Sequence, residues 1–200
     1  MSALPHTPGV AFELDGQPIT ARPGETILKA AQRHGVEIPH LCYSDGLRPD
    51  GNCRACVVEI AGERTLAPSC CRAPTEGMKV QAASPRARKS QQMVVEMLLS
   101  DMPDTGYRWN DGGINAPELI ASSAYPSSTS GQFESKNPET IGQHGELSQW
   151  ADRLGVSVRP ALKALRREQP APDLSHPAMA VNLDACIQCN RCVRACREEQ

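Results

Sequence analysis

Nine cysteines in 200 residues constrain this chain more than any other feature, because they fall into two groups. One group lies between Cys42 and Cys71, the other between Cys186 and Cys196, and no cysteine separates them. The N-terminus lacks the basic and apolar regions of a signal peptide, so we expect a cytoplasmic, reducing compartment in which disulfides are disfavoured. An odd number of cysteines also fits disulfides poorly. Metal ligation is therefore the better explanation of these thiols.

The first group has the spacing C-x10-C-x2-C-x13-C and consists of Cys42, Cys53, Cys56 and Cys70. The loop between the first two is rich in Gly, Pro and Asp, so its backbone can direct N–H groups toward anionic sulfur. Four thiolates from a loop and a more distant position favour a [2Fe–2S] cluster. The alternatives are unliganded core cysteines or zinc, which usually takes two C-x2-C pairs or Cys and His pairs; His40 is the nearby histidine. Cys71 is expected to be a small buried thiol.

The second group has the spacing C-x2-C-x2-C-x3-C, which is typical of bacterial ferredoxins that bind [4Fe–4S] clusters, with zinc as the alternative. We expect Cys186, Cys189 and Cys192 to bind one [4Fe–4S] cluster from a tight loop. The x3 step enters a helix, which we expect to turn Cys196 toward a second [4Fe–4S] cluster with its other ligands beyond residue 200. The neighbouring arginines either offset cluster charge or form a solvated basic helix: Arg191, Arg194 and Arg197.

The first hundred residues predict a small mixed sheet crossed by one helix, an α+β arrangement. Residues 10–21 read as a hairpin that turns at Asp15-Gly16, and residues 55–69 as a second hairpin, followed by a strand over 78–83. The helix between the hairpins has its expected inner face at Ile27, Leu28 and Ala31, and ends at Gly35.

A longer helix is predicted after the sheet, with Ser84 as its N-cap. We expect its apolar stripe to pack against the sheet; the stripe consists of Met93, Val94, Met97 and Leu98. Two short helical patterns and a Pro-rich tether over 169–180 follow a polar, irregular insertion. The predicted domains are a [2Fe–2S] domain over 1–83, a helical linker region over 84–178, and the start of a [4Fe–4S] module over 179–200.

Two segments, IPHLCYSDGLRPDGNCRACVVEI and SCCRAPTEGMKV, resemble the β-grasp [2Fe–2S] domain of the large iron–sulfur subunit of NADH dehydrogenases. The same domain opens related subunits of NAD-linked hydrogenases and formate dehydrogenases. GNCRACVVEIAGERTLAPSC and LDACIQCNRCVRACRE are most similar to the catalytic (alpha) subunit of molybdenum- or tungsten-dependent, NAD-linked formate dehydrogenases. The resemblance covers residues 10–102 and 146–200.

This resemblance implies the N-terminal iron–sulfur region of a longer polypeptide, with electron-transfer sites and no catalytic residue of its own. Electrons from formate would leave a molybdenum or tungsten bis-pterin cofactor in a C-terminal part and pass through the clusters to a flavin subunit that reduces NAD. The implied partners are flavin- and NAD-binding iron–sulfur subunits. A relay subunit of an NAD-linked hydrogenase or NADH dehydrogenase is the alternative, and a zinc-binding interaction module is a third.

Relatives of this kind usually carry H-x3-C-x2-C-x5-C between the two cysteine groups, as ligands of a further [4Fe–4S] cluster. Here Met102 stands at the histidine position, Gly106 at the first cysteine position and Gly145 at the last. We therefore expect no cluster over residues 102–145, and an aromatic side chain over the vacated site, either Tyr107 or Trp109. We also expect a chain ending at Gln200 to assemble no stable [4Fe–4S] cluster.

Composition argues against two classes of partner. A net charge of −2 gives no reason to expect nucleic acid or an anionic membrane surface. No run of residues is long and apolar enough to predict a membrane span.

Overall fold

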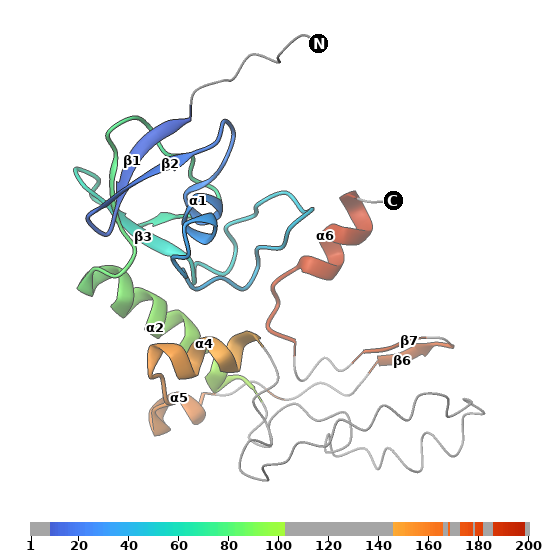
Figure 1. Ribbon diagram of the computed structural model, residues 1–200. Coiled ribbons are helices and arrows are strands. Elements are labelled where there is room, and N and C mark those ends of the chain that lie inside the picture. Colours follow the sequence, from blue (N-terminus) through green and yellow to red (C-terminus); the bar gives the residue numbers. More distant parts are fainter. Residues whose placement is uncertain are drawn as a thin grey trace, which may run out of the picture. The chain divides into compact units, whose positions relative to one another are not determined.

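A computed structural model describes residues 9–102, 146–165, 168, 173–177, 179–181 and 186–198. Its first part is a five-stranded mixed sheet with the order β2-β1-β5-β3-β4. The strands are β1 (Val10–Leu14), β2 (Gln17–Ala21), β3 (Val57–Ile60), β4 (Ala67–Pro68) and β5 (Lys79–Gln81). β1 and β5 are parallel, and the other neighbouring strands are antiparallel. Helix α1 (Ile27–Arg33) lies across this sheet (Figure 1), which confirms the α+β prediction.

The turn between β1 and β2 follows from its two residues. Asp15 and Gly16 both have left-handed backbones, with φ of 48° and 83°, as a two-residue hairpin loop requires. The Asp15 carboxylate also accepts hydrogen bonds from the backbone N–H groups of Ala82 (2.8 Å) and Ala83 (3.2 Å). The turn is therefore fixed both by its own conformation and by the residues that follow β5.

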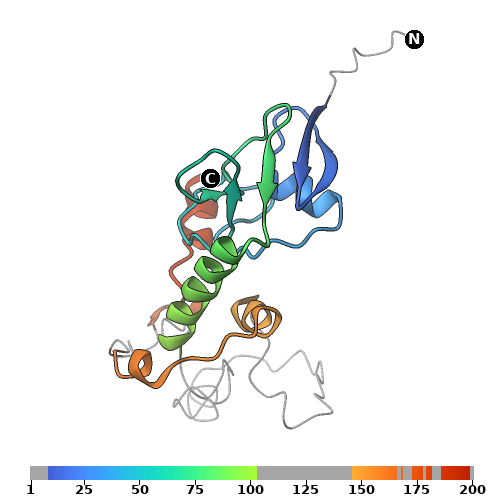
Figure 2. The ribbon, with the colours of Figure 1, turned by 90° about the vertical axis from the view of Figure 1, so that its left-hand side faces the viewer.

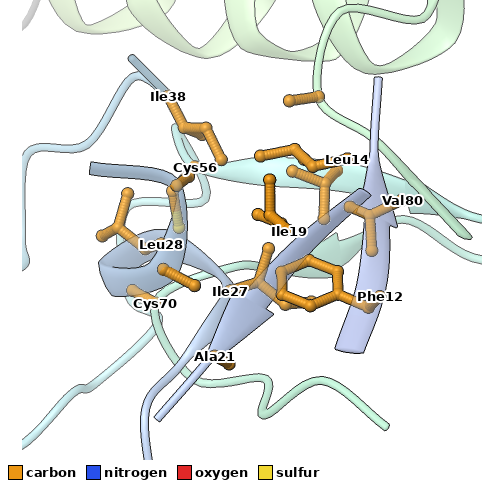
Figure 3. Close-up of a cluster of buried hydrophobic side chains, with 14 of the residues drawn as sticks. Phe12, Leu14, Ile19, Ala21, Ile27, Leu28, Ile38, Cys56, Cys70 and Val80 are labelled. Atoms are coloured by element: carbon orange, nitrogen blue, oxygen red, sulfur yellow. The ribbon is translucent and has the colours of Figure 1, made fainter. Parts of the chain in front are cut away.

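Helix α1 begins and ends where the sequence predicts. The Thr26 side chain caps its N-terminus by accepting from the backbone N–H of Lys29. Gly35, with φ of 76°, follows its last turn. The inner face predicted from the sequence is fully buried, and Figure 3 shows Ile27 and Leu28 among the core side chains beside Cys56 and Cys70. Two of the candidate ligands thus belong to the hydrophobic core itself.

Helix α2 (Pro85–Ser100) has the predicted cap, because the Ser84 hydroxyl accepts from the backbone N–H of Ala87 at 3.1 Å. The prediction that the apolar stripe packs against the sheet is wrong, because Met93 and Met97 are 48% and 60% exposed. The buried row is instead Ala87, Gln91 and Val95.

Gln91 explains why this row faces inward. Its side-chain amide donates to the carbonyls of Val57 (2.9 Å) and Ala82 (3.1 Å), and the residue is only 2% exposed. Val57 begins β3 and Ala82 directly follows β5, so one amide joins α2 to both strands. Figure 2 shows α2 continuing the chain directly after β5.

The chain divides into two compact units, Met1–Met97 with Gln188–Gln200, and Leu98–Ile187. The second unit contains α4 (Glu146–Leu154) and α5 (Pro160–Lys163), where two helical patterns were predicted. It also contains an antiparallel pair, β6 (Asp173–His176) and β7 (Met179–Val181), where the sequence predicts only a tether. Pro177 follows β6 directly, at a position where its fixed φ suits a turn. Helix α6 (Arg191–Glu198) belongs to the first unit.

The predicted domain boundaries and the predictions for residues 103–145 stay predictions. The three domain boundaries are not tested by these two units. Residues 103–145, where we expect a vacated cluster site with an aromatic cover, lie outside the described residues. Among the helices in the described ranges, none combines the length and apolarity needed to cross a bilayer.

Candidate metal centre

The fold brings the four cysteines of the first group together. Cys42, Cys56 and Cys70 are buried, and Cys53 is half-buried. Side-chain hydrogen bonds join the thiol of Cys53 to that of Cys42, Cys42 to Cys70, and Cys70 to Cys56. Four residues spread over 29 positions of the sequence thus form one continuous row of sulfur atoms.

Backbone N–H groups point at sulfur on the loop side of this row. The amide of Cys42 donates to Cys53 Sγ at 3.4 Å, and the amide of Cys53 donates to Cys42 Sγ at 3.5 Å. The amide of Asn52 adds a second donor to Cys42. Arg54, inside the C-x2-C turn, has a left-handed φ of 60°. Such turns expose successive N–H groups to one side, which stabilises negative charge on thiolates.

The other side of the row is held by Ser69. Its backbone N–H and its hydroxyl both donate to the carbonyl of Cys56, at 3.1 and 2.7 Å, and the residue is fully buried. Helix α1 holds the same segment, because the N–H of Leu28 donates to the carbonyl of Ser69 and that of Ile27 to the carbonyl of Arg72. The first N–H groups of a helix have no partner inside it, so here they fix the turn that carries Cys70.

The loop that starts at Cys42 is anchored to α1 by a polar cluster. Asp45 Oδ1 accepts from the Tyr43 hydroxyl at 2.9 Å and from Lys29 Nζ. Hydrogen bonds from Lys29 and then Tyr43 lower the pKa of Asp45. His40, considered as a zinc ligand, has its Nδ1 2.8 Å from the carbonyl of Ile38.

Contacts among the thiols divide them into two acceptors and two donors. Hydrogen bonds from Cys53 and then Cys70 lower the pKa of Cys42 to about 2. The hydrogen bond from Cys70 lowers the pKa of Cys56 to about 7. The pKa of Cys53 rises because of its contact with Cys42, and that of Cys70 because of its contacts with Cys42 and Cys56. The thiolate is the form that binds metal, and hydrogen bonds from neighbouring groups stabilise it.

This donor set fits a [2Fe–2S] cluster. Four thiols line one buried position, with amide donors beside them and no charged side chain in the row itself. Contacts join Cys42 to Cys53 and to Cys70, and Cys70 to Cys56, so the four thiols form one connected set.

Cys71 does not have the predicted environment. The prediction of a buried thiol is wrong, because Cys71 is exposed, with its Sγ 3.5 Å from that of Cys70. The reason is the tight turn in which the N–H groups of Cys71 and Arg72 both donate to the carbonyl of Pro68. Cys70 occupies the inward position of this turn, and the next residue faces outward.

The second group lies on one non-helical stretch and one helix. Cys186 and Cys189 lie in the non-helical stretch 186–190, and Cys192 and Cys196 on α6. Gln188 and Asn190 have left-handed φ values of 54° and 59°, so the chain curls between the cysteines. Cys189 is half-buried, whereas the other three are exposed.

The structure adds a helix geometry to the separate role expected for Cys196, which no observation here tests. Cys192 and Cys196 are four residues apart on α6, so they lie on the same face of the helix. The four-residue step displaces Cys196 from Cys192 along the helix axis by about 6 Å. Which thiols share a cluster stays a prediction.

The sequence analysis did not predict a role for Ser69, and it left the environment of Arg194 open. Ser69 gave no signal, because its role depends on a carbonyl 13 positions earlier. Of the three arginines near the second group, Arg194 is not solvated: it is 7% exposed and donates to the carbonyls of Cys42 and Arg48.

The sheet, the helix across it and the convergent thiols define the class of this part of the chain. Residues 7–85 match the family described as 2Fe-2S iron-sulfur cluster binding domain. This stretch is therefore a [2Fe–2S] ferredoxin-like domain.

The wider chain is similar to proteins of NADH- and NADP-linked complexes. It is 30% identical over 185 residues to the mitochondrial NADH-ubiquinone oxidoreductase 78 kDa subunit of Candida albicans, covering 92% of this chain and 22% of that protein. It is 30% identical over 206 residues to NADP-reducing hydrogenase subunit HndD of Solidesulfovibrio fructosivorans, covering 96% of this chain and 28% of that protein. The chain thus spans less than a third of these relatives.

One solved structure extends this similarity to the fold. A chain in the crystal structure of NAD+-reducing [NiFe]-hydrogenase in the H2-reduced state matches with a TM-score of 0.64 and 26% sequence identity. The match covers 95% of this chain and 67% of that chain.

Proposed function

We propose that the chain is an electron-transfer segment of an NAD-linked oxidoreductase, with a [2Fe–2S] cluster held by Cys42, Cys53, Cys56 and Cys70. The observation that carries this proposal is the convergence of these four thiols on backbone N–H donors. A bound cluster of this type accepts and releases one electron at a time without breaking a substrate bond.

The residues of the chain prepare this position for a cluster. Burial of Cys42, Cys56 and Cys70 to 1% exposure or less keeps water from the sulfur atoms. Amide donors stabilise their negative charge, and the double hydrogen bond from Ser69 fixes one ligand pair. A preorganised ligand set changes little when the cluster gains an electron, which favours rapid transfer.

The second group extends the relay in this proposal. Cys186, Cys189 and Cys192 hold one [4Fe–4S] cluster, and Cys196 ligates a second one. The cysteine spacing and the left-handed residues between the first three cysteines support this assignment.

Two parent enzymes are considered. An iron–sulfur relay subunit of a hydrogenase or NADH dehydrogenase is supported by the names of the similar proteins. The N-terminal part of a formate dehydrogenase catalytic subunit, with a molybdenum or tungsten bis-pterin cofactor beyond it, is supported by the two sequence segments that resemble that family. Both assign flavin- and NAD-binding iron–sulfur subunits as partners.

The cluster assignment is tested by iron analysis and EPR of the purified, reduced protein. We expect a [2Fe–2S] signal that Cys53→Ser abolishes or grossly alters. Cys71→Ser is the matched control, because it replaces an exposed thiol beside the site and should leave the signal nearly intact. An unchanged signal in Cys53→Ser would refute the ligand set, and stoichiometric zinc without iron would favour the zinc module.

The parent enzyme is tested on the purified complex. NAD reduction by formate, with molybdenum or tungsten in the preparation, would support the formate dehydrogenase. NAD reduction by hydrogen, or NADH oxidation without either metal, would support the relay subunit.

A further inference from the structure

We propose that Arg194 is a positioning residue that holds helix α6, and with it two cysteines of the second group, against the Cys42–Cys53 loop, and that its charge raises the reduction potential of the first metal centre. The docking is a property of the fold. The effect on potential rests on the proposed [2Fe–2S] cluster.

The evidence for docking is a set of contacts between segments far apart in the sequence. Arg194 Nη1 donates to the carbonyl of Arg48, and Nη2 donates to the carbonyl of Cys42. Glu198, one turn further along α6, accepts from the backbone N–H of Arg48 at 3.0 Å. The Asn52 side chain donates to the carbonyl of Gln188 at 3.2 Å. These partners are separated by 136 to 152 positions, and all lie in the first compact unit.

Arginine suits this position better than lysine. Its planar guanidinium presents several N–H donors in a fixed fork, so it can satisfy two carbonyls at once. The acceptors are backbone carbonyls, so the arrangement of the loop, and not its side chains, sets the geometry. Because one of these carbonyls belongs to Cys42, the arginine directly fixes a candidate ligand from the helix that carries Cys192 and Cys196.

The buried Arg194 guanidinium has one carboxylate, that of Asp50, at the limit of ion-pair distance. The residue is 7% exposed, its Nε lies 4.0 Å from Asp50 Oδ2, and this Nε has no hydrogen-bond partner in the described part of the chain. Buried cations are normally paired, because removal from water is costly. An anionic cluster ligated by Cys42 would place a second negative charge near this guanidinium.

A nearby buried cation favours the more negative state of a redox centre. Reduction adds one electron to the cluster, so Arg194 stabilises the reduced form more than the oxidised form. Its removal should lower the reduction potential, whereas the loss of an exposed arginine, screened by water, should change it little.

Three variants of the complete protein separate these effects. Arg194→Met removes the charge and the fork but keeps the apolar stem, and Arg194→Lys keeps only the charge. Arg197→Met is the matched control, because Arg197 is on the same helix and exposed. Circular dichroism checks that each variant is folded.

The first measurement is hydrogen–deuterium exchange over residues 42–53 and 188–198, which needs no cluster. We expect exchange at the backbone N–H of Arg48 and in α6 to be about tenfold faster or more in Arg194→Met, to be intermediate in Arg194→Lys, and to be unchanged in Arg197→Met. Equal exchange in Arg194→Met and Arg197→Met would overturn the docking role. If Arg194→Met does not fold, Arg194→Lys against Arg197→Met decides the question.

The second measurement is a redox titration of the [2Fe–2S] EPR signal. We expect the potential to fall in Arg194→Met, to stay closer to that of the wild type in Arg194→Lys, and to remain unchanged in Arg197→Met. A potential in Arg194→Met equal to that of the wild type would overturn the electrostatic role. Absence of any iron signal in the wild type would instead refute the proposed function, and the exchange measurement would still decide whether Arg194 docks the helix.

Discussion

Gly51 lies where the loop of the candidate metal centre passes close to Cys71. Its φ is +64°, and a Cβ atom there would lie 3.0 Å from Cys71 Sγ and 3.8 Å from the Pro68 side chain. Gly46, in the same loop, also has a positive φ of +85°, but a Cβ there would meet nothing within 4 Å. Replacing Gly46 therefore tests backbone strain alone, whereas replacing Gly51 tests backbone strain together with a steric contact.

We predict that Gly51→Ala destabilises the protein and reduces its cluster content more than Gly46→Ala does. Both changes carry a left-handed backbone cost of about 1–2 kcal/mol. The close contact should add up to about 1 kcal/mol at Gly51 only. Urea unfolding and iron content measure the two effects. The double variant Gly51→Ala/Cys71→Ala should return to the level of Gly46→Ala, and no recovery would contradict the steric explanation.

At the scale of single residues, predictability depends on whether the signal is local. The Asp15-Gly16 turn was predictable because the dipeptide itself favours left-handed backbones. The spacing of the cysteines also identified the four thiols that the fold brings together. The environment of Cys71 was not predictable, because a single turn at Pro68 decides which of two adjacent thiols faces inward.

At the scale of elements, the buried face of α2 depends on one polar side chain. We predict that Gln91→Leu costs about 2 kcal/mol or more in the free energy of unfolding, because two buried carbonyls lose their donor. Met93→Gln should change stability by less than about 0.5 kcal/mol, because Met93 is 48% exposed and lies outside the buried row. Urea unfolding of both variants measures the difference, and a larger cost for Met93→Gln would restore the apolar-stripe interpretation.

The same helix shows why its face could not be predicted. Apolar residues at positions 93, 94, 97 and 98 form a stripe of helical periodicity, which normally indicates the inner face. The competing row contains a glutamine, whose partners at Val57 and Ala82 exist only once the sheet has formed. Tertiary hydrogen bonds therefore determined an orientation that periodicity alone assigned incorrectly.

Helix α1 provides a prediction about pH. Glu25 accepts from Arg33 Nε at 3.1 Å and Nη2 at 2.9 Å, and from the backbone N–H of Arg22 at 2.7 Å. The hydrogen bond from Arg33 is the main cause that lowers the pKa of Glu25 below its ordinary value of 4.5. A lowered pKa means that the folded state prefers the carboxylate. The resulting stability is fully present above the ordinary pKa and is lost as the pH falls through the folded pKa.

We therefore expect Glu25→Gln to be less stable than the wild type near neutral pH, by about 0.5 kcal/mol because the pair is close to the surface. The difference should disappear once the pH falls below the folded pKa of Glu25, where both side chains are neutral. Thermal unfolding between about pH 7 and about pH 3 measures it. A difference that stays constant with pH would contradict the role of the Glu25 charge.

At the scale of the whole molecule, the second cysteine group is attached to the first by contacts that the sequence does not reveal. From the sequence alone, each of the three arginines near the second group could either offset cluster charge or belong to a solvated basic helix. Only the fold distinguishes Arg194, whose carbonyl acceptor at Cys42 lies 152 positions earlier. The cysteine motifs are local and could be predicted, whereas the contact that joins them is long-range and could not.

The last prediction concerns how Cys196 is used. Cys192 and Cys196 share a face of α6, and a four-residue step separates them by about 6 Å along the axis. This displacement allows each thiol to ligate a different cluster while both project from the same side of the helix. We expect Cys189→Ser to abolish the EPR signal of one [4Fe–4S] cluster in the complete protein. Cys196→Ser should leave that signal and alter the signal of another cluster.

Iron analysis of the same two variants gives an independent measure of this assignment. Each serine variant should lose the iron of one cluster and keep the iron of the other. Cys71→Ser is the control for loss of an exposed thiol, and should retain the full iron content. If Cys189→Ser and Cys196→Ser abolish one and the same signal, all four cysteines of the second group serve a single cluster. The shared helix face would then mean that one cubane spans both turns of α6.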